Sequence, residues 1–127
     1  MDEAPIPTFH KTFELTSDKG NKFIITFKII KSAALHISAI FDDGIVKTFY
    51  ESEFTLEKIQ EHKAFSIYDS IEEICAELFP LINESKVHLS ETEENEDKII
   101  RINFELPFKK FKSYDFIVNE KKKTTKE

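Results

Sequence analysis

Hydrophobic and polar residues alternate along the first half of the chain. From residue 23 to residue 29, phenylalanine and isoleucine occupy every second position, and threonine and lysine lie on the opposite face. A spacing of two is typical of a strand with one buried face. Similar alternation occurs around residues 9–15, 35–41 and 45–50, with turn-forming residues between the segments. The pattern predicts four strands in an antiparallel meander.

The middle of the chain changes to helical spacing. Thr55 is expected to cap a short first helix. A second helix is expected to begin at Asp69 or Ser70, because each is followed three residues later by a glutamate, as in a capping box. Apolar residues then recur three and four positions apart over residues 71–82. Pro80 lies inside this stripe, and its missing N–H predicts a kink or an early end.

The last third returns to alternation. Val87 and Leu89 predict a short strand, residues 100–106 give the clearest strand of the chain, and residues 114–118 predict a final one. The acidic run from Glu91 to Asp97 is expected to be a loop between the first two of these strands.

This order of elements predicts an α+β fold. We expect an antiparallel seven-strand β-sandwich or strongly bent sheet, with a helix-turn-helix inserted between strands four and five. The helix pair would cover one open end or edge of the sheet. The expected organisation is an N-terminal tail over residues 1–7, a single globular domain over residues 8–118, and a basic disordered tail over residues 119–127.

Composition narrows the possible partners. The chain has 127 residues, of which 40% are hydrophobic and 33% charged, and this balance is typical of a globular domain. A net charge of -6 argues against nucleic-acid binding, which needs basic side chains to neutralise phosphates. No apolar run is long enough for a membrane span, and the acidic N-terminus does not resemble a signal peptide. We expect a cytoplasmic protein, with the nucleus and the cytoskeleton as alternatives.

The residues that usually carry chemistry are few and scattered. His10, His36, His62 and His88 are too far apart in sequence to suggest a metal site. Cys75 lies in the apolar stripe of the second helix, and the glutamates near it would raise its pKa, which does not suit a nucleophile. The two glycines belong to turns and form no phosphate-binding loop. We therefore expect no enzyme activity, no metal and no cofactor.

The segment over residues 106–112 is unusual. It should be the turn between the last two strands, and it carries Phe108 and Phe111 among lysines. One interpretation is that one or both rings fold back over the end of the core. The other is that a ring is offered to a protein partner, because exposed aromatic residues often anchor interfaces.

The layout resembles the globular head of the XRCC-type superfamily, which includes DNA end-joining scaffold proteins and the centriolar cartwheel protein. The helical insertion over residues 54–85 carries this likeness, which covers about residues 8–118. The stretches at residues 54–59, 64–65 and 70–74 are also similar to an N-terminal module of protist coiled-coil proteins.

The resemblance implies a head that is not catalytic, precedes a long coiled coil and makes head-to-head contacts. In the cartwheel branch, an apolar residue in the turn between the last two strands fills a pocket on the next head. Phe108 or Phe111 occupies that turn here. Residues 119–127 contain no apolar heptad, which departs from the pattern of a head followed by a stalk.

Two functions follow from these observations. The first is a non-catalytic scaffold head that binds a protein. The partner can be a second copy of the chain, in a weak homodimer. The contact is the turn that carries Phe108 and Phe111. It requires at least one of the two rings to be exposed. The alternative is a module that binds a peptide or small ligand in a cleft between the sheet and the helix pair, without self-association.

Overall fold

The chain folds into two antiparallel sheets and a short helical segment. The computed structural model describes residues 10–30, 34–94, 97–107 and 110–121. The first sheet has four strands in sequence order: β1 (His10–Thr16), β2 (Lys22–Ile30), β3 (Ala34–Asp42) and β4 (Lys47–Thr55). The second sheet has three: β5 (Val87–Glu94), β6 (Asp97–Glu105) and β7 (Ser113–Asn119).

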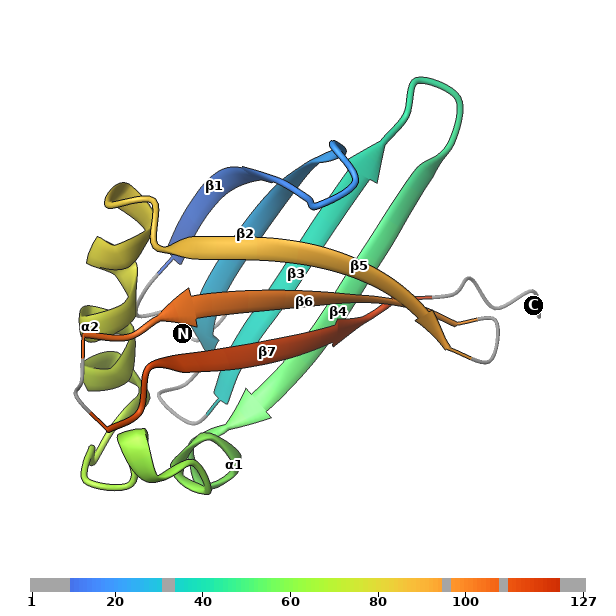
Figure 1. Ribbon diagram of the computed structural model, residues 1–127. Helices are drawn as coiled ribbons and strands as arrows, with labels where there is room; N and C mark the ends of the chain where they lie inside the picture. Colours follow the sequence, from blue (N-terminus) through green and yellow to red (C-terminus); the bar gives the residue numbers. More distant parts are fainter. Residues whose placement is uncertain (1–9, 31–33, 95–96, 108–109, 122–127) are drawn as a thin grey trace, which may run out of the picture.

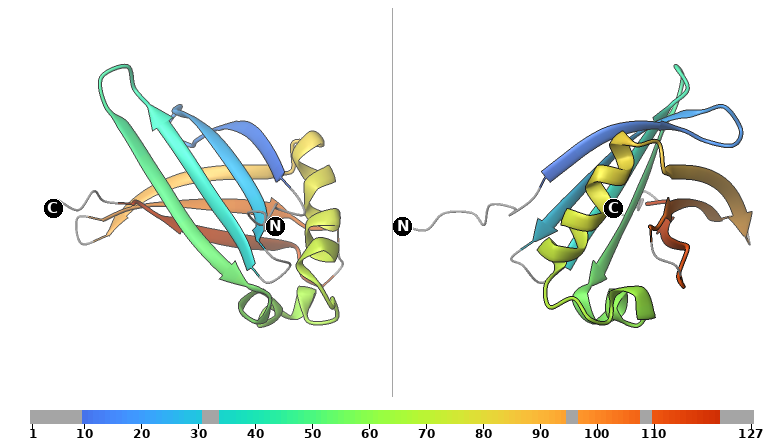
Figure 2. Two further views of the ribbon diagram at one scale, coloured as in Figure 1. Left: turned by 180° about the vertical axis from the view of Figure 1, so that it is seen from behind. Right: turned by 60° about the vertical axis from the view of Figure 1, so that its left-hand side comes forward.

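The helical segment connects the two sheets and closes one end of the molecule. It contains α1 (Leu56–Gln60), the 3₁₀ helix η1 (Lys63–Phe65) and α2 (Ile71–Asn83). Figure 1 shows the strands of one sheet crossing those of the other obliquely, with α2 lying across the end where the sheets separate. The two views of Figure 2 show the same arrangement from behind and from the side, with the β3–β4 hairpin extending beyond the rest of the body.

The alternation of residues in the strands builds one core between the sheets. Phe27 on β2 lies at its centre, with ring centroids 6.0 Å from Phe104 on β6 and 5.8 Å from Phe116 on β7. All three side chains are fully buried. Edge-to-face contacts of this kind add to the free energy gained from burying each ring. The phenylalanines therefore hold the two sheets together across the core.

Short contacts join the two sheets at both edges. After β1, Ser17 forms a parallel bridge with Leu89 of β5, and the Asp18 N–H donates to the Leu89 carbonyl at 2.9 Å. On the other side, the Lys121 N–H donates to the Phe49 carbonyl of β4 at 2.7 Å. Residues 120 and 121, expected to belong to the C-terminal tail, thus pair with strands. The proposed tails at residues 1–7 and 122–127 lie outside the described residues.

Two glycines make turns that other residues would strain. Gly20 has φ +84° between β1 and β2, and Gly44 has φ +91° at the tip of the β3–β4 hairpin. The Asp43 carboxylate accepts hydrogen bonds from the N–H groups of Ile45 at 2.9 Å and Val46 at 2.8 Å. Ile45 and Val46 are both exposed on this ordered tip.

Both predicted helix starts are confirmed. The Thr55 side chain caps α1 by accepting from the Lys58 N–H at 3.2 Å. The Ser70 side chain caps α2 by accepting from the Glu73 N–H at 3.2 Å, and the Glu73 carboxylate accepts from the Asp69 N–H at 2.9 Å. These caps satisfy backbone donors that have no partner inside the helix.

Two local predictions need correction. The acidic run at residues 91–97 is mostly strand, because Glu91 pairs with Ile100 and Glu93 with Lys98, so β5 continues to Glu94. The second helix does not end early, because α2 continues past Pro80 to Asn83. The Pro80 carbonyl still accepts from the Glu84 N–H at 3.2 Å, so the proline removes only its own donor.

The fold class is confirmed at the level of an α+β domain built from antiparallel strands. Seven strands and a helical insertion between β4 and β5 are present in the part of the chain that the structure describes. The strands form two sheets rather than a single continuous one. Within the same residues, no helix has the length and apolar character needed to cross a membrane.

Candidate protein-docking site

The turn between β6 and β7 is fixed at its base. Leu106 is buried, and its N–H donates to the Lys112 carbonyl at 2.8 Å. The ring of Phe111 is partly buried and meets the His62 ring edge-on, with 5.6 Å between centroids. Phe108, the other candidate, lies outside the described residues. The structure therefore places Phe111 at the margin of the core beside the helical segment.

The connection between α1 and α2 forms the other wall of the site. The Phe65 ring is buried against Tyr114, with 5.0 Å between centroids, and anchors this segment to β7. The Gln60 side-chain amide donates to the Tyr68 carbonyl at 2.7 Å. These contacts hold the backbone on both sides of Ile67, whose side chain is 77% exposed. The exposure of Ile67 thus follows from a fixed backbone.

An apolar hollow lies between these two segments. Its cavity volume is about 210 Å³, and its lining residues are Lys63, Ala64, Ile67, Tyr68 and Phe111. Pockets for drug-sized ligands usually have about 300–1,000 Å³. The hollow is smaller than that and suits a single apolar side chain. We call this cavity the apolar hollow below.

Charges of opposite sign flank the apolar hollow. Lys63 lines it, and Lys110 and Lys112 are exposed on either side of Phe111. On the other side, burial raises the pKa of the Tyr68 hydroxyl above its usual value, and the negative charges of Glu77 and Glu73 add to this shift. The carboxylates of Glu73 and Glu77 on α2 therefore lie within electrostatic range of the lining residue Tyr68.

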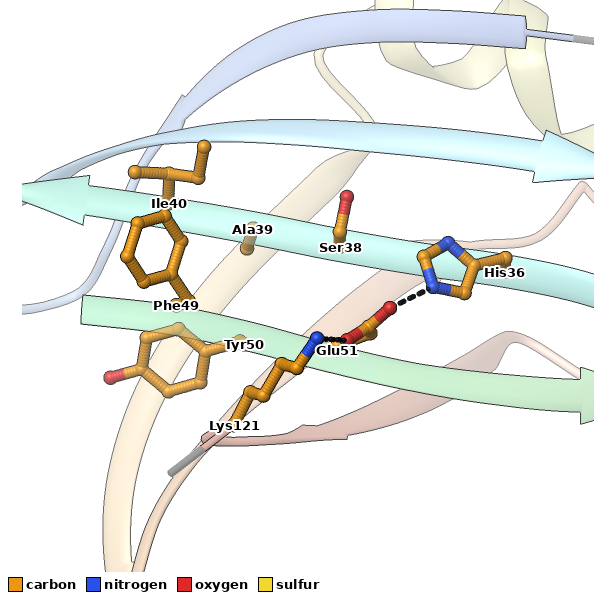
Figure 3. A pocket seen from close by; sticks show the side chains of 8 residues that line it. All are labelled: His36, Ser38, Ala39, Ile40, Phe49, Tyr50, Glu51 and Lys121. Atoms are coloured by element: carbon orange, nitrogen blue, oxygen red, sulfur yellow. Dashed lines mark hydrogen bonds and ion pairs between the residues drawn. The ribbon is translucent and has the colours of Figure 1, made fainter. Parts of the chain in front are cut away.

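A second apolar surface lies on the outer face of the four-stranded sheet. Ile24, Ile40 and Phe49 are paired across β2, β3 and β4, and all three side chains are exposed. We call them the outer apolar row. Next to it is a cavity of about 450 Å³. Its lining residues, drawn in Figure 3, are His36, Ser38, Ala39, Ile40, Phe49, Tyr50, Glu51 and Lys121.

The polar end of this second cavity is held by an ionic network. The Glu51 carboxylate forms an ion pair with Lys121 at 2.9 Å and a hydrogen bond with His36 at 2.5 Å (Figure 3). The bond to Lys121 lowers the pKa of Glu51, and the bond to His36 lowers it further. Burial raises the pKa of Tyr50 to about 12, with smaller effects from nearby glutamates. The network joins Glu51 to the Nε2 atom of His36, whereas the buried Nδ1 atom of the same ring has no hydrogen-bond partner in the described part of the chain.

The residues that usually carry chemistry are engaged elsewhere. Cys75 is buried on α2, and burial raises the pKa of its thiol to about 12, as its apolar position predicted. His36 is partly buried against Glu51, whereas His88 remains exposed and bonds to Glu105. Among the described residues, no group of three or more potential ligands could hold a metal ion.

Sequence reasoning missed the wall opposite Phe111. Ile67 and Tyr68 lie between two predicted helices, where no regular repeat of apolar residues indicates whether a side chain is buried or exposed. The available sign was an isoleucine in a polar connection, because a large apolar residue in a surface loop is uncommon. Its position beside Phe111 depends on a contact between segments more than 40 residues apart in the chain, which is visible only in the fold.

Comparison with known proteins gives limited information. No family model matches the chain. One similar protein is a clustered mitochondria protein homolog from Lodderomyces elongisporus, which is 26% identical over 121 residues. The match covers 91% of this chain and 8% of the relative. The chain is therefore similar to one small part of a much longer protein.

Proposed function

We propose that the domain is a non-catalytic scaffold head that associates with a second copy of itself through the apolar hollow and the turn that carries Phe111. The proposal includes membership of the XRCC-type head superfamily, which the order of strands and helices resembles. It also includes a sandwich arrangement of the two sheets. A cytoplasmic location is also part of the proposal, and the free thiol of Cys75 is compatible with a reducing compartment. The observation that carries the proposal is the 77% exposure of Ile67 beside the apolar hollow.

The arrangement suits contact between identical copies. Phe111 and Ile67 are apolar side chains that could enter a partner, and the apolar hollow between them could receive one. A two-fold interface uses the same surface on both partners, so it needs a projection and a recess on each. One chain has both a projection and a recess at the end that the helical segment closes.

The expected association is weak. Burying one isoleucine side chain stabilises a complex by about 1.5–3 kcal/mol, and a two-fold contact does this twice. Association costs about 4–15 kcal/mol in lost translation and rotation. Two buried Ile67 side chains exceed the lowest of these costs by about 2 kcal/mol at most, so the remaining surface of Phe111 and its neighbours must supply the rest. The dimer should therefore be weak and form at millimolar concentrations.

Molar mass by light scattering across a concentration series tests the proposal. For wild type, the mass should rise towards twice the monomer value with concentration. Ile67→Glu and Phe111→Glu should each hold the mass at the monomer value, because a carboxylate would be desolvated in the contact. Ile45→Glu is the matched control, since Ile45 is 90% exposed on the distant β3–β4 hairpin.

Circular dichroism melting should accompany each variant. Ile67→Glu is expected to keep the wild-type melting temperature, because its side chain contributes little buried area. A wild-type mass that stays monomeric at all concentrations would exclude self-association. Equal loss of association in Ile45→Glu would show that the contact lies elsewhere.

A second candidate function is peptide or ligand binding at the outer apolar row. The supporting observation is the cavity of about 450 Å³ beside Ile40 and Phe49. This is not the cleft between sheet and helix pair that the sequence suggested, because the cavity lies across β3 and β4. The dye ANS, which fluoresces on apolar surfaces, should bind wild type, and Phe49→Ser should reduce this fluorescence. Equal fluorescence in both would exclude the row as the binding surface.

A further inference from the structure

We infer that the two copies meet in a two-fold arrangement in which the basic β6–β7 turn of each lies against the acidic start of α2 of the other. The inference rests on the self-association proposed above. It adds the orientation of the second copy and the charges that select it. Its basis is the opposite charge on the two sides of the apolar hollow.

The basic side belongs to the turn. Lys110 and Lys112 are exposed and flank Phe111, and Lys63 lines the apolar hollow nearby. Within the described residues, none of these three lysines forms an ion pair. Their charges are therefore free to meet a partner. If the same turn of a second copy met this surface, lysines would face lysines.

The acidic side belongs to α2. Glu73 and Glu77 are one helical turn apart, both are exposed, and both raise the pKa of Tyr68, which lines the apolar hollow. Glu73 also accepts the Asp69 N–H in the helix cap. Glu77 forms no ion pair within the described residues. This side presents negative charge beside Tyr68, on the wall of the apolar hollow opposite Phe111.

Both sides lie at the same end of the domain. Figure 1 shows β6 ending and β7 beginning at the end of the molecule that α2 covers. A two-fold axis through the apolar hollow would place each basic turn over the other copy's acidic helix start. Complementary charge of this kind selects a register and disfavours the wrong one. The chemistry of the surface therefore fits a second copy in this orientation.

A pair of charge variants tests the orientation. The first, Lys110→Glu/Lys112→Glu, makes the turn acidic. The second, Glu73→Gln/Glu77→Lys, removes negative charge from α2 and reverses part of it, and glutamine is accepted in a capping box. Each variant alone should associate at least about tenfold more weakly than wild type, because each dimer would then join like charges.

The mixture of the two variants is the decisive measurement. In a 1:1 mixture, the acidic turn of the first meets the basic helix of the second, and the first variant's acidic helix meets the second variant's basic turn. Association should return to within about threefold of wild type, with a dimer as the product. Association of wild type should also weaken as salt is raised from about 0.1 M to 1 M, because screening shortens the range of these charges.

The outcomes separate this inference from the function on which it rests. If wild type never associates, the proposed self-association itself is wrong. If wild type associates and both variants do so equally well, the contact exists but the charges do not orient it, and the inference is wrong. A mixture that fails to associate also overturns it. Complexes larger than a dimer would indicate a head-to-tail contact in place of the two-fold one. Both variants should melt at the same temperature as wild type, which would show that folding is unchanged.

Discussion

The Ser17 side chain joins the two sheets through one small polar cluster. Ser17 is 6% exposed, and its hydroxyl donates to the Glu91 carboxylate at 2.5 Å. The same hydroxyl oxygen accepts from the N–H groups of Lys19 at 3.1 Å and Asn21 at 3.2 Å. The Asn21 side-chain amide also donates to Glu91 at 2.8 Å. Removing one hydroxyl thus affects three hydrogen bonds, of which one joins the β1–β2 turn to β5 and two lie within the turn.

Ser17→Ala should lower the free energy of unfolding by about 2 kcal/mol. A hydrogen bond to a charged acceptor contributes about 1.5–3 kcal/mol. Glu91 would keep its bond from Asn21, and water can reach the N–H of the exposed Lys19, so the total stays near that of one bond. The corresponding fall in melting temperature is about 6–8 °C for a domain of this size. Urea unfolding followed by circular dichroism measures it.

Thr12→Ala is the matched control for this change. Thr12 also shares a hydroxyl hydrogen bond, with Thr26 at 3.1 Å, but that bond is exposed on the sheet surface. Its loss should change the free energy of unfolding by no more than about 0.5 kcal/mol. A double-mutant cycle of Ser17→Ala with Glu91→Ala should give a coupling energy of about 1–2 kcal/mol. Equal effects at Ser17 and Thr12, with no coupling to Glu91, would refute the assigned role.

Three further predictions concern the core and the titrating groups. Phe27→Ala should cost about 3–5 kcal/mol of stability in urea unfolding, and a cost under about 1.5 kcal/mol would show that the core collapses around it. Folding lowers the pKa of Glu51 below its value of 4.5 in the unfolded chain. The ionised carboxylate therefore stabilises the fold above pH 4.5, and this contribution is lost as the pH falls through the lowered pKa of the folded state. The stability difference between wild type and Lys121→Met should therefore shrink from about pH 6 to pH 3 in urea titrations, and a constant difference would contradict the ion pair. Cys75 should react with a thiol reagent at pH 8 only after unfolding, because its pKa is raised to about 12, and rapid reaction of the native protein would contradict its burial.

The strands and helix caps could be predicted from sequence because local spacing decides them. The alternation in residues 23–29 corresponds to four side chains of β2 that are fully buried. The caps at Thr55 and Ser70 follow from side-chain oxygens that reach donors three residues away. The acidic run at 91–97 misled the prediction, because the Glu91 carboxylate has partners far away in the sequence. Glu91 bonds to Ser17, and such a long-range contact leaves no periodic pattern.

The candidate site could be predicted only in part. Phe111 was identifiable because an aromatic residue among lysines in a turn is unusual. Ile67 and Tyr68 were not, because the apolar hollow forms only when the α1–α2 connection packs beside the β6–β7 turn. The buried contact of Phe65 with Tyr114 holds the α1–α2 connection in that position. The position of a surface cavity depends on such tertiary contacts, whereas strand and helix periods depend on neighbours in the chain.

The two ends of the domain differ in what their side chains do, and this difference separates residues that stabilise the fold from residues of the proposed contact. At the end away from α2, Ser17 and Glu91 use their polar groups to join the sheets. At the helical end, the backbone around Ile67 is held by other residues, so the exposed side chain adds little to stability. Single exposed apolar residues are common on protein surfaces, but Ile67 stands beside an apolar cavity and the ring of Phe111. Folding does not require that grouping, and the contact proposed with a second copy would give it a physical reason.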